Sequence, residues 1–135
     1  MLLFNRTIFL AFAISFLAFA CGKMEVPEGV TYEVLSPDDF EQKLAQLGDV
    51  HLIDARTPPE LEKGHLPNVL NYDYRADEIK KAVKELDKNK PVLIYCGSGI
   101  RSQKAAEIMI GAGFTEIYDM EGGMKAWLAA GKEVE

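Results

Sequence analysis

The sequence has few cysteines, no excess of basic residues and almost no charge near its N-terminus. It contains two cysteines, and its 15 basic and 21 acidic residues give a net charge of −6. A net acidic chain without a basic cluster argues against nucleic-acid binding and against electrostatic attachment to a membrane. The chain has no Walker loop and no Rossmann glycine pattern, and no group of His, Cys, Asp and Glu has metal-ligand spacing. We therefore expect no metal and no cofactor.

Arg6 is the only charged side chain before Lys23. Residues 8–20 form an almost unbroken apolar run, which is short for a bilayer span and typical of a signal-peptide core. The small residues before Cys21 resemble the lipobox of bacterial lipoproteins. The sequence therefore predicts a signal peptide over 1–20 and a lipid anchor on Cys21, which would hold the protein stably on a membrane. The alternatives are an uncleaved N-terminal anchor and ordinary secretory cleavage after Ala20.

Cleavage before Cys21 leaves 115 of the 135 residues, enough for one domain with one core. It also removes Arg6 and makes the net charge one unit more negative. We expect a tether over 21–31, a domain over 32–131, and a monomer on the periplasmic side of a bacterial envelope. Inner and outer membranes both stay open. If Cys21 is acylated, Cys96 is the only thiol of the mature protein, and a lone thiol in an oxidising compartment points to catalysis.

Strand and helix patterns alternate along the predicted domain. The run 91–95 is apolar without alternation, as expected for a central strand covered on both faces. Repeated β–α alternation predicts an α/β fold with a mainly parallel sheet of about five strands and helices on both faces. From the last helix we expect Met124, Trp127 and Leu128 to face the core. The expected strands are 32–35, 50–53, 69–71, 91–95 and 116–118, and the expected helices are 37–47, 58–62, 77–86, 103–112 and one that contains 124–128.

Cys96 follows the central strand and opens a loop that consists of Cys96, Gly97, Ser98, Gly99, Ile100, Arg101 and Ser102. A helix pattern follows at once, so unpaired backbone N–H groups are expected around the sulfur. The two glycines reach positive φ cheaply and let the loop curl into a nest of amides. The positive end of the helix, together with Arg101, favours the thiolate over the thiol. These features are typical of a nucleophile.

This loop resembles the active-site loop of rhodanese-like domains, which are sulfurtransferases. Residues 52–67 are similar to the family's first signature, and residues 113–127 are similar to its closing one. The resemblance implies a rhodanese-like fold and transfer of a sulfane sulfur through a Cys96 persulfide. The donor would be a small anionic sulfur compound, such as thiosulfate or a persulfide, and the acceptor a thiol or cyanide. Loop residues 97–102 would bind the substrate, with Arg101 orienting the anionic donor.

Ligands of parallel sheets bind at the carboxyl ends of the strands. Three groups stand at predicted strand ends, namely 54–56, 96–101 and 119–123, and we expect them to converge. The resemblance implies a supporting role for Asp54 and Arg56, and an ion pair unrelated to chemistry is the alternative. We expect His65 to anchor its loop through a hydrogen bond, because a thiolate at a helix end needs no dedicated base.

Two other functions stay open. Cysteine-dependent phosphatases and arsenate reductases also hold an oxyanion between a thiolate and an arginine, but with Cys-x5-Arg spacing. Here four residues separate Cys96 from Arg101, and the smaller ring suits a single sulfur atom better than a phosphate. A non-catalytic sulfur carrier or interaction module is the second alternative. The Cys-Gly-Ser-Gly start is similar to mercaptopyruvate sulfurtransferases, but those enzymes usually have an uncharged residue at the position of Arg101. The physiological donor and acceptor therefore stay open.

Overall fold

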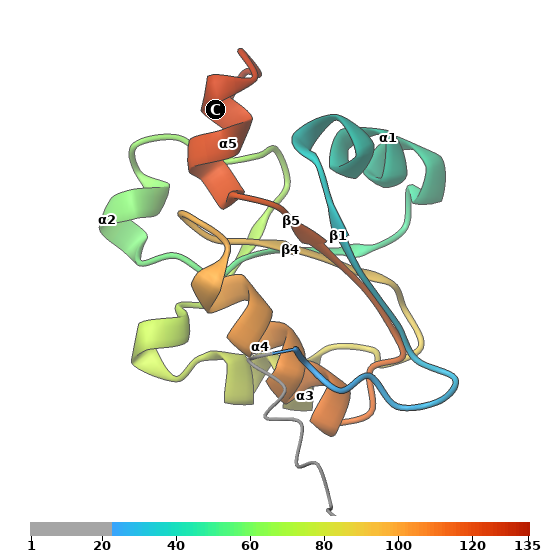
Figure 1. The fold of residues 1–135 in the computed structure, drawn as a ribbon. Coiled ribbons are helices and arrows are strands. Elements are labelled where there is room, and N and C mark those ends of the chain that lie inside the picture. The colour runs from blue at the N-terminus through green and yellow to red at the C-terminus, as the bar shows by residue number, and fades with distance from the viewer. Residues whose placement is uncertain (1–22) are drawn as a thin grey trace, which may run out of the picture.

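A five-stranded parallel sheet forms the centre of the domain (Figure 1). The computed structural model describes residues 23–135, so the predicted signal peptide and Cys21 lie outside the described residues. The strand order is β1-β5-β4-β2-β3, and every neighbouring pair is parallel. The predicted α/β architecture is therefore confirmed. The strands are β1 (Thr31–Leu35), β2 (His51–Asp54), β3 (Leu70–Asn71), β4 (Val92–Tyr95) and β5 (Glu116–Met120).

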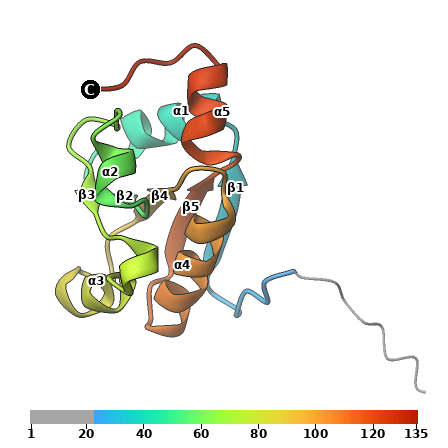
Figure 2. The same ribbon diagram turned by 90° about the vertical axis from the view of Figure 1, so that its left-hand side faces the viewer.

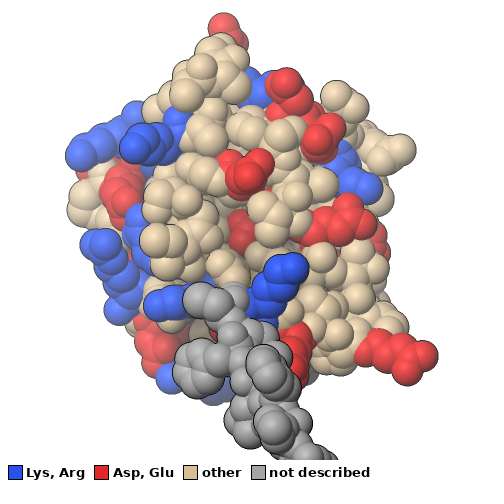
Figure 3. All heavy atoms as spheres, in the orientation of Figure 1, with Lys and Arg blue, Asp and Glu red and all other residues tan. Residues whose placement is uncertain are grey.

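Helices cover both faces of this sheet, as expected. Figures 1 and 2 show α1 and α5 on one face and α3 and α4 on the other. None of the helices within residues 23–135 is long and apolar enough to cross a membrane. Basic and acidic side chains are interspersed on the face drawn in Figure 3. The helices are α1 (Pro37–Leu47), α2 (Pro58–Leu61), α3 (Ile79–Glu85), α4 (Ile100–Gly111) and α5 (Gly123–Ala129), with a 3₁₀ turn, η1, at Tyr74–Ala76.

The central strand β4 divides the core into two clusters. Its side chains alternate, so that Ile94 packs in the cluster that contains Met109 of α4, and Leu93 packs in the cluster that contains Phe40 of α1. All four residues of β4 are buried, which explains why the run shows no polar alternation. The rigid sheet fixes the carboxyl end of β4, where Cys96 follows.

The last helix differs from the prediction at one position. Met124 and Trp127 are 5% exposed, as expected for core residues, but Leu128 is 53% exposed. The prediction that Leu128 faces the core is therefore wrong. Successive helical residues are rotated by about 100°, so the neighbour of a residue that points into the core turns toward solvent.

The ends of α1 and α4 show how local sequence sets the boundaries. Ser36 caps α1 by accepting a hydrogen bond from the Asp39 amide (3.2 Å), and Gly48 at φ 69° ends it, as predicted. Helix α4 begins at Ile100, three residues before the predicted start, because Gly99 at φ 99° already turns the chain into the helix. Arg101 consequently lies in the first turn of α4 rather than in a loop.

Candidate active site

Cys96 lies at the junction of β4 and α4, buried at the carboxyl edge of the sheet. The backbone N–H of Gly99 donates to Cys96 Sγ over 3.1 Å. Since Gly99 is also the N-cap of α4, a helix of 12 residues, the positive end of its dipole lies beside the sulfur. This geometry places a backbone donor where negative charge on the sulfur would be stabilised.

The start of α5 holds the other side of the loop. The amides of Met124 and Lys125 donate to the carbonyl oxygens of Cys96 (2.8 Å) and Gly97 (3.0 Å). Gly123 makes this approach possible, because it has φ 57° and a Cβ there would overlap the Cys96 carbonyl oxygen. The structure thus brings Gly123, the last residue of the predicted group 119–123, against the loop.

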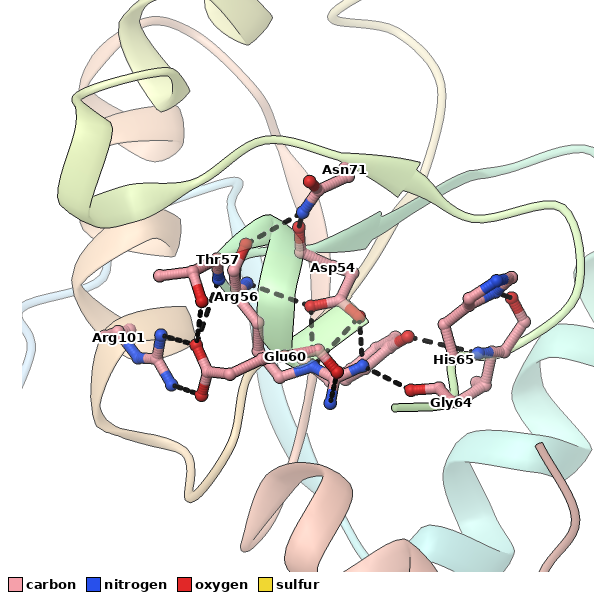
Figure 4. Close-up of polar contacts among 10 residues, drawn as sticks. Asp54, Arg56, Thr57, Glu60, Gly64, His65, Asn71 and Arg101 are labelled. Carbon is pink, nitrogen blue, oxygen red and sulfur yellow. Dashed lines mark hydrogen bonds and ion pairs between the residues drawn. The ribbon is translucent and has the colours of Figure 1, made fainter. Parts of the chain in front are cut away.

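Arg101 forms a two-pronged ion pair with Glu60 of α2 (Figure 4). Its Nη1 and Nη2 donate to Glu60 Oε2 (2.8 Å) and Oε1 (2.7 Å). These bonds from Arg101 hold the pKa of the Glu60 carboxyl well below its usual range, and Glu60 in turn raises the pKa of Arg101. A donor that reaches this site therefore meets a guanidinium that is already paired with a carboxylate.

Glu60 is itself held in place by the turn that carries it. Its Oε2 accepts from the Thr57 amide (3.0 Å) and from the Thr57 hydroxyl (2.8 Å). Gly97 leaves room for the guanidinium, since a Cβ at that position would lie 3.0 Å from Arg101 Nη2. The Glu60–Arg101 pair therefore lies directly beside the loop that holds the sulfur.

Asp54 and Arg56 brace the segment that carries Glu60 (Figure 4). Arg56 Nε donates to both carboxylate oxygens of Asp54 over 3.0 Å, and its Nη2 donates to Asp54 Oδ2 (2.7 Å). The same guanidinium donates to the carbonyl oxygens of Gly64 (2.8 Å) and Glu60 (3.2 Å). Both side chains are buried. Through these bonds Arg56 fixes both ends of the turn 60–64.

The remaining predicted residues have structural contacts. His65 Nδ1 lies 3.0 Å from the Leu66 carbonyl oxygen, and the His65 backbone pairs with Glu135. The buried Ser102 hydroxyl donates to the Gly99 carbonyl oxygen over 3.3 Å and so supports the loop from inside. Ile100 is 64% exposed and forms an apolar rim. Within residues 23–135 no three His, Cys, Asp or Glu side chains are grouped as metal ligands.

Sequence reasoning missed two residues that the structure places beside the site. Glu60 carries a local signal, because Thr57 and Glu60 have capping-box spacing around a helix start. That signal predicts the turn but not the partner of Glu60 across the sheet edge. Tyr32 has no such signal, and its hydroxyl donates to Asp119 Oδ2 over 2.8 Å.

The fold and the site together define a parallel α/β domain in which Cys96 lies at a helix N-terminus. The chain belongs to the rhodanese family: the rhodanese-like domain matches residues 36–130. This result confirms the family resemblance of the three sequence motifs. The predicted signal peptide and lipid attachment stay predictions.

Proteins similar to this chain include a named sulfurtransferase and two proteins of known structure. Thiosulfate sulfurtransferase GlpE of Pseudomonas syringae is 34% identical over 91 residues, which cover 67% of this chain and 83% of that protein. A rhodanese-related protein from Thermoplasma volcanium has a TM-score of 0.67 at 28% identity, with 77% of this chain and 98% of that one covered. A possible tyrosine phosphatase from Rhodopseudomonas palustris has a TM-score of 0.64 at 28% identity, with 77% and 85% covered.

Proposed function

We propose that this protein is a rhodanese-type sulfurtransferase in which Cys96 carries the sulfur. The observation that carries the proposal is the 3.1 Å contact from the Gly99 N–H to Cys96 Sγ at the N-terminus of α4. Such a donor stabilises charge on the cysteine sulfur and on a second sulfur bound to it. The name of the GlpE relative, a thiosulfate sulfurtransferase, supports the same function.

The reaction consists of two displacements at sulfur. The Cys96 thiolate attacks the outer sulfur of the donor, a new S–S bond forms, and the bond from that sulfur to its leaving group breaks. With thiosulfate, sulfite leaves with the electron pair. An acceptor thiolate or cyanide then attacks the terminal sulfur, the S–S bond breaks, and the Cys96 thiolate is restored. Electrons balance in each step, so the covalent intermediate needs no cofactor.

The strongest rival is phosphate chemistry, because the similar protein from Rhodopseudomonas palustris is described as a possible tyrosine phosphatase. The spacing of the loop favours sulfur transfer here. Four residues separate Cys96 from Arg101, which makes a ring suited to one sulfur atom.

The test compares the wild type with Cys96→Ser, which keeps the shape but does not ionise at neutral pH. The reduced wild type, incubated with thiosulfate, should gain the mass of one sulfur atom and form thiocyanate from cyanide over many turnovers. Cys96→Ser should do neither. Persulfide without turnover would identify a sulfur carrier, and hydrolysis of an aryl phosphate without persulfide would identify a phosphatase. Thiosulfate, mercaptopyruvate and glutathione persulfide, compared as donors, then rank the substrates.

We also propose that the protein is exported and lipid-anchored through Cys21, on the periplasmic side of the envelope. The apolar run 8–20 and the small residues before Cys21 support this proposal. Protein extracted from membranes should enter the detergent phase and carry a lipid mass that Cys21→Ala lacks. A soluble wild type with unmodified Cys21 would instead indicate plain secretory cleavage.

A further inference from the structure

A pocket of about 260 Å³ lies beside the Cys96 loop, and neither Glu60 nor Arg101 lines it. It is bounded by β1, by the end of β5 and by the start of α4, and its walls include Ser98, Gly99 and Ile100. Gly99 is the residue whose N–H lies 3.1 Å from the cysteine sulfur. The pocket and the reacting sulfur therefore share one wall.

Asp119 lines this pocket and is only 1% exposed. Its Oδ2 accepts a hydrogen bond from the Tyr32 hydroxyl (2.8 Å), but its Oδ1 is buried without a partner. Among the described residues it is the one buried side-chain oxygen or nitrogen without a partner. The neighbouring Ser102 hydroxyl donates to the Gly99 carbonyl oxygen, and burial raises the pKa of Asp119 although Ser102, Tyr32 and the Met120 amide partly offset it. A buried carboxylate oxygen without a donor is costly, so a ligand that supplies an N–H would be bound.

The charges around the pocket specify the kind of ligand. Asp119 and Glu121 are both part of its lining, and no lysine or arginine is. Burial raises the pKa of Asp119 to about 6, so its carboxylate is ionised in mildly alkaline solution. An anionic sulfur donor is disfavoured in such surroundings, whereas an ammonium group is favoured. The two sets of charges beside the loop thus differ, with the Arg101–Glu60 ion pair in one and two acids in the other.

We propose that this pocket binds the ammonium group of the sulfur acceptor, which is a small primary aminothiol. The ammonium pairs with the Asp119 carboxylate while the thiol reaches over the rim formed by Ser98 and Ile100. The acceptor thiolate attacks the terminal sulfur of the Cys96 persulfide, the S–S bond breaks, and the product leaves as an aminothiol persulfide. The inference rests on the proposed sulfur transfer, and it names the acceptor class.

The kinetic test uses the purified protein at pH 8 with aminothiols of two to four carbons and hydroxythiols of the same lengths. Asp119→Asn should raise the KM for at least one aminothiol about tenfold, the loss expected for one charged hydrogen bond, and the KM for hydroxythiols less than about twofold. The matched control is Glu33→Gln, which removes an exposed acid of β1 that does not line the pocket and should leave the preference intact. Equal effects of both variants, or equal effects on both thiol series, would overturn the proposal.

A binding test separates failure of this proposal from failure of the proposed function. The probe is 2-(methylthio)ethylamine, which carries the ammonium but no thiol. It should shift the amide resonances of Gly99 and Gly122 saturably in the wild type and not in Asp119→Asn, and it should compete with aminothiols in the wild type. If Cys96 forms no persulfide, the function fails while this titration still decides whether the pocket binds amines. Absence of these shifts and of competition in an active wild type would refute the proposal.

Discussion

Glu60→Gln is the perturbation that tests how the site handles an anionic donor. In the structure both oxygens of the Glu60 carboxylate accept hydrogen bonds from Arg101, at 2.8 and 2.7 Å. Glutamine has nearly the same shape and can still accept one of these bonds through its amide oxygen. The substitution therefore removes a negative charge next to the guanidinium while it keeps the turn that Thr57 caps. Arg101 then presents its positive charge to the ligand.

Two opposing effects give the expected magnitudes. The lost charge-assisted hydrogen bond destabilises the fold by about 1 kcal/mol, because the pair is partly exposed and solvent screens it. The freed charge attracts a dianion such as thiosulfate by about 1–2 kcal/mol in a surface-like dielectric. This difference corresponds to a KM for thiosulfate that falls about five- to thirtyfold. An uncharged organic trisulfide should show less than about twofold change, since it has no net charge to attract.

The assay is the steady-state rate of thiocyanate formation, measured at low and high salt. The matched control is Glu62→Gln, which makes the same charge change at an exposed position two residues along the chain and should leave KM unaltered. High salt should reduce the gain of Glu60→Gln because it screens the attraction. A rise in KM of equal size for thiosulfate and for the uncharged donor would refute the reasoning and show that Glu60 only shapes the loop.

Three further predictions concern the support of the site. Arg56→Lys should lower the free energy of unfolding in urea by about 2–3 kcal/mol, because the carbonyl oxygens of Gly64 and Glu60 lose their guanidinium donor. An unchanged urea midpoint would show that these bonds from Arg56 do not stabilise the fold. Gly123→Ala should reduce sulfur transfer at least about tenfold, because the new Cβ pushes the Cys96 carbonyl away. The control is Gly131→Ala: Gly131 also has a positive φ of 74°, but a Cβ there meets nothing within 4 Å, so the variant should lose only about 1–2 kcal/mol of stability from backbone strain. Equal activities of the two variants would exclude a role for the approach of Gly123 to Cys96. Burial raises the pKa of Asp119 from 3.8 to about 6, so its contribution to stability is fully present below pH 4 and is lost as the pH rises through 6. Asp119→Asn should therefore match the wild type at pH 4 and exceed its unfolding free energy by up to about 3 kcal/mol at pH 8; a difference that does not vary with pH would contradict the burial argument.

The features that the sequence predicts well are those with local causes. Ser36, Pro37 and Gly48 determine both ends of α1, and the unbroken apolar run at β4 identifies the central strand. The predicted start of α4 is three residues late, because Gly99 begins the helix inside a stretch that resembles a loop. In the first turn of α4 the apolar Ile100 is exposed and the polar Ser102 is buried, so the turn does not show the hydrophobic pattern of a helix.

The contacts that sequence reasoning did not predict join residues far apart in the chain. Glu60 and Arg101 are 41 residues apart, and Tyr32 and Asp119 are 87 apart. Glu60 and Arg101 follow the carboxyl ends of β2 and β4, which are neighbours in the sheet, and Tyr32 and Asp119 lie on the neighbouring strands β1 and β5. A single sequence shows that these residues are polar and stand near strand ends. Their pairing depends on strand order, which the β–α alternation does not specify.

The same pairings connect the first signature segment to the sulfur loop. Asp54 holds Arg56, Arg56 holds both ends of the turn 60–64, and Glu60 of that turn holds Arg101 beside Gly97. A change at Asp54 therefore reaches the loop through hydrogen bonds rather than through contact with a substrate. Asp119 meets the loop through Gly99 and the pocket wall. The Arg101–Glu60 ion pair and the Asp119 carboxylate thus lie at different parts of the loop, so the proposed anionic donor and cationic acceptor would not compete for the same groups.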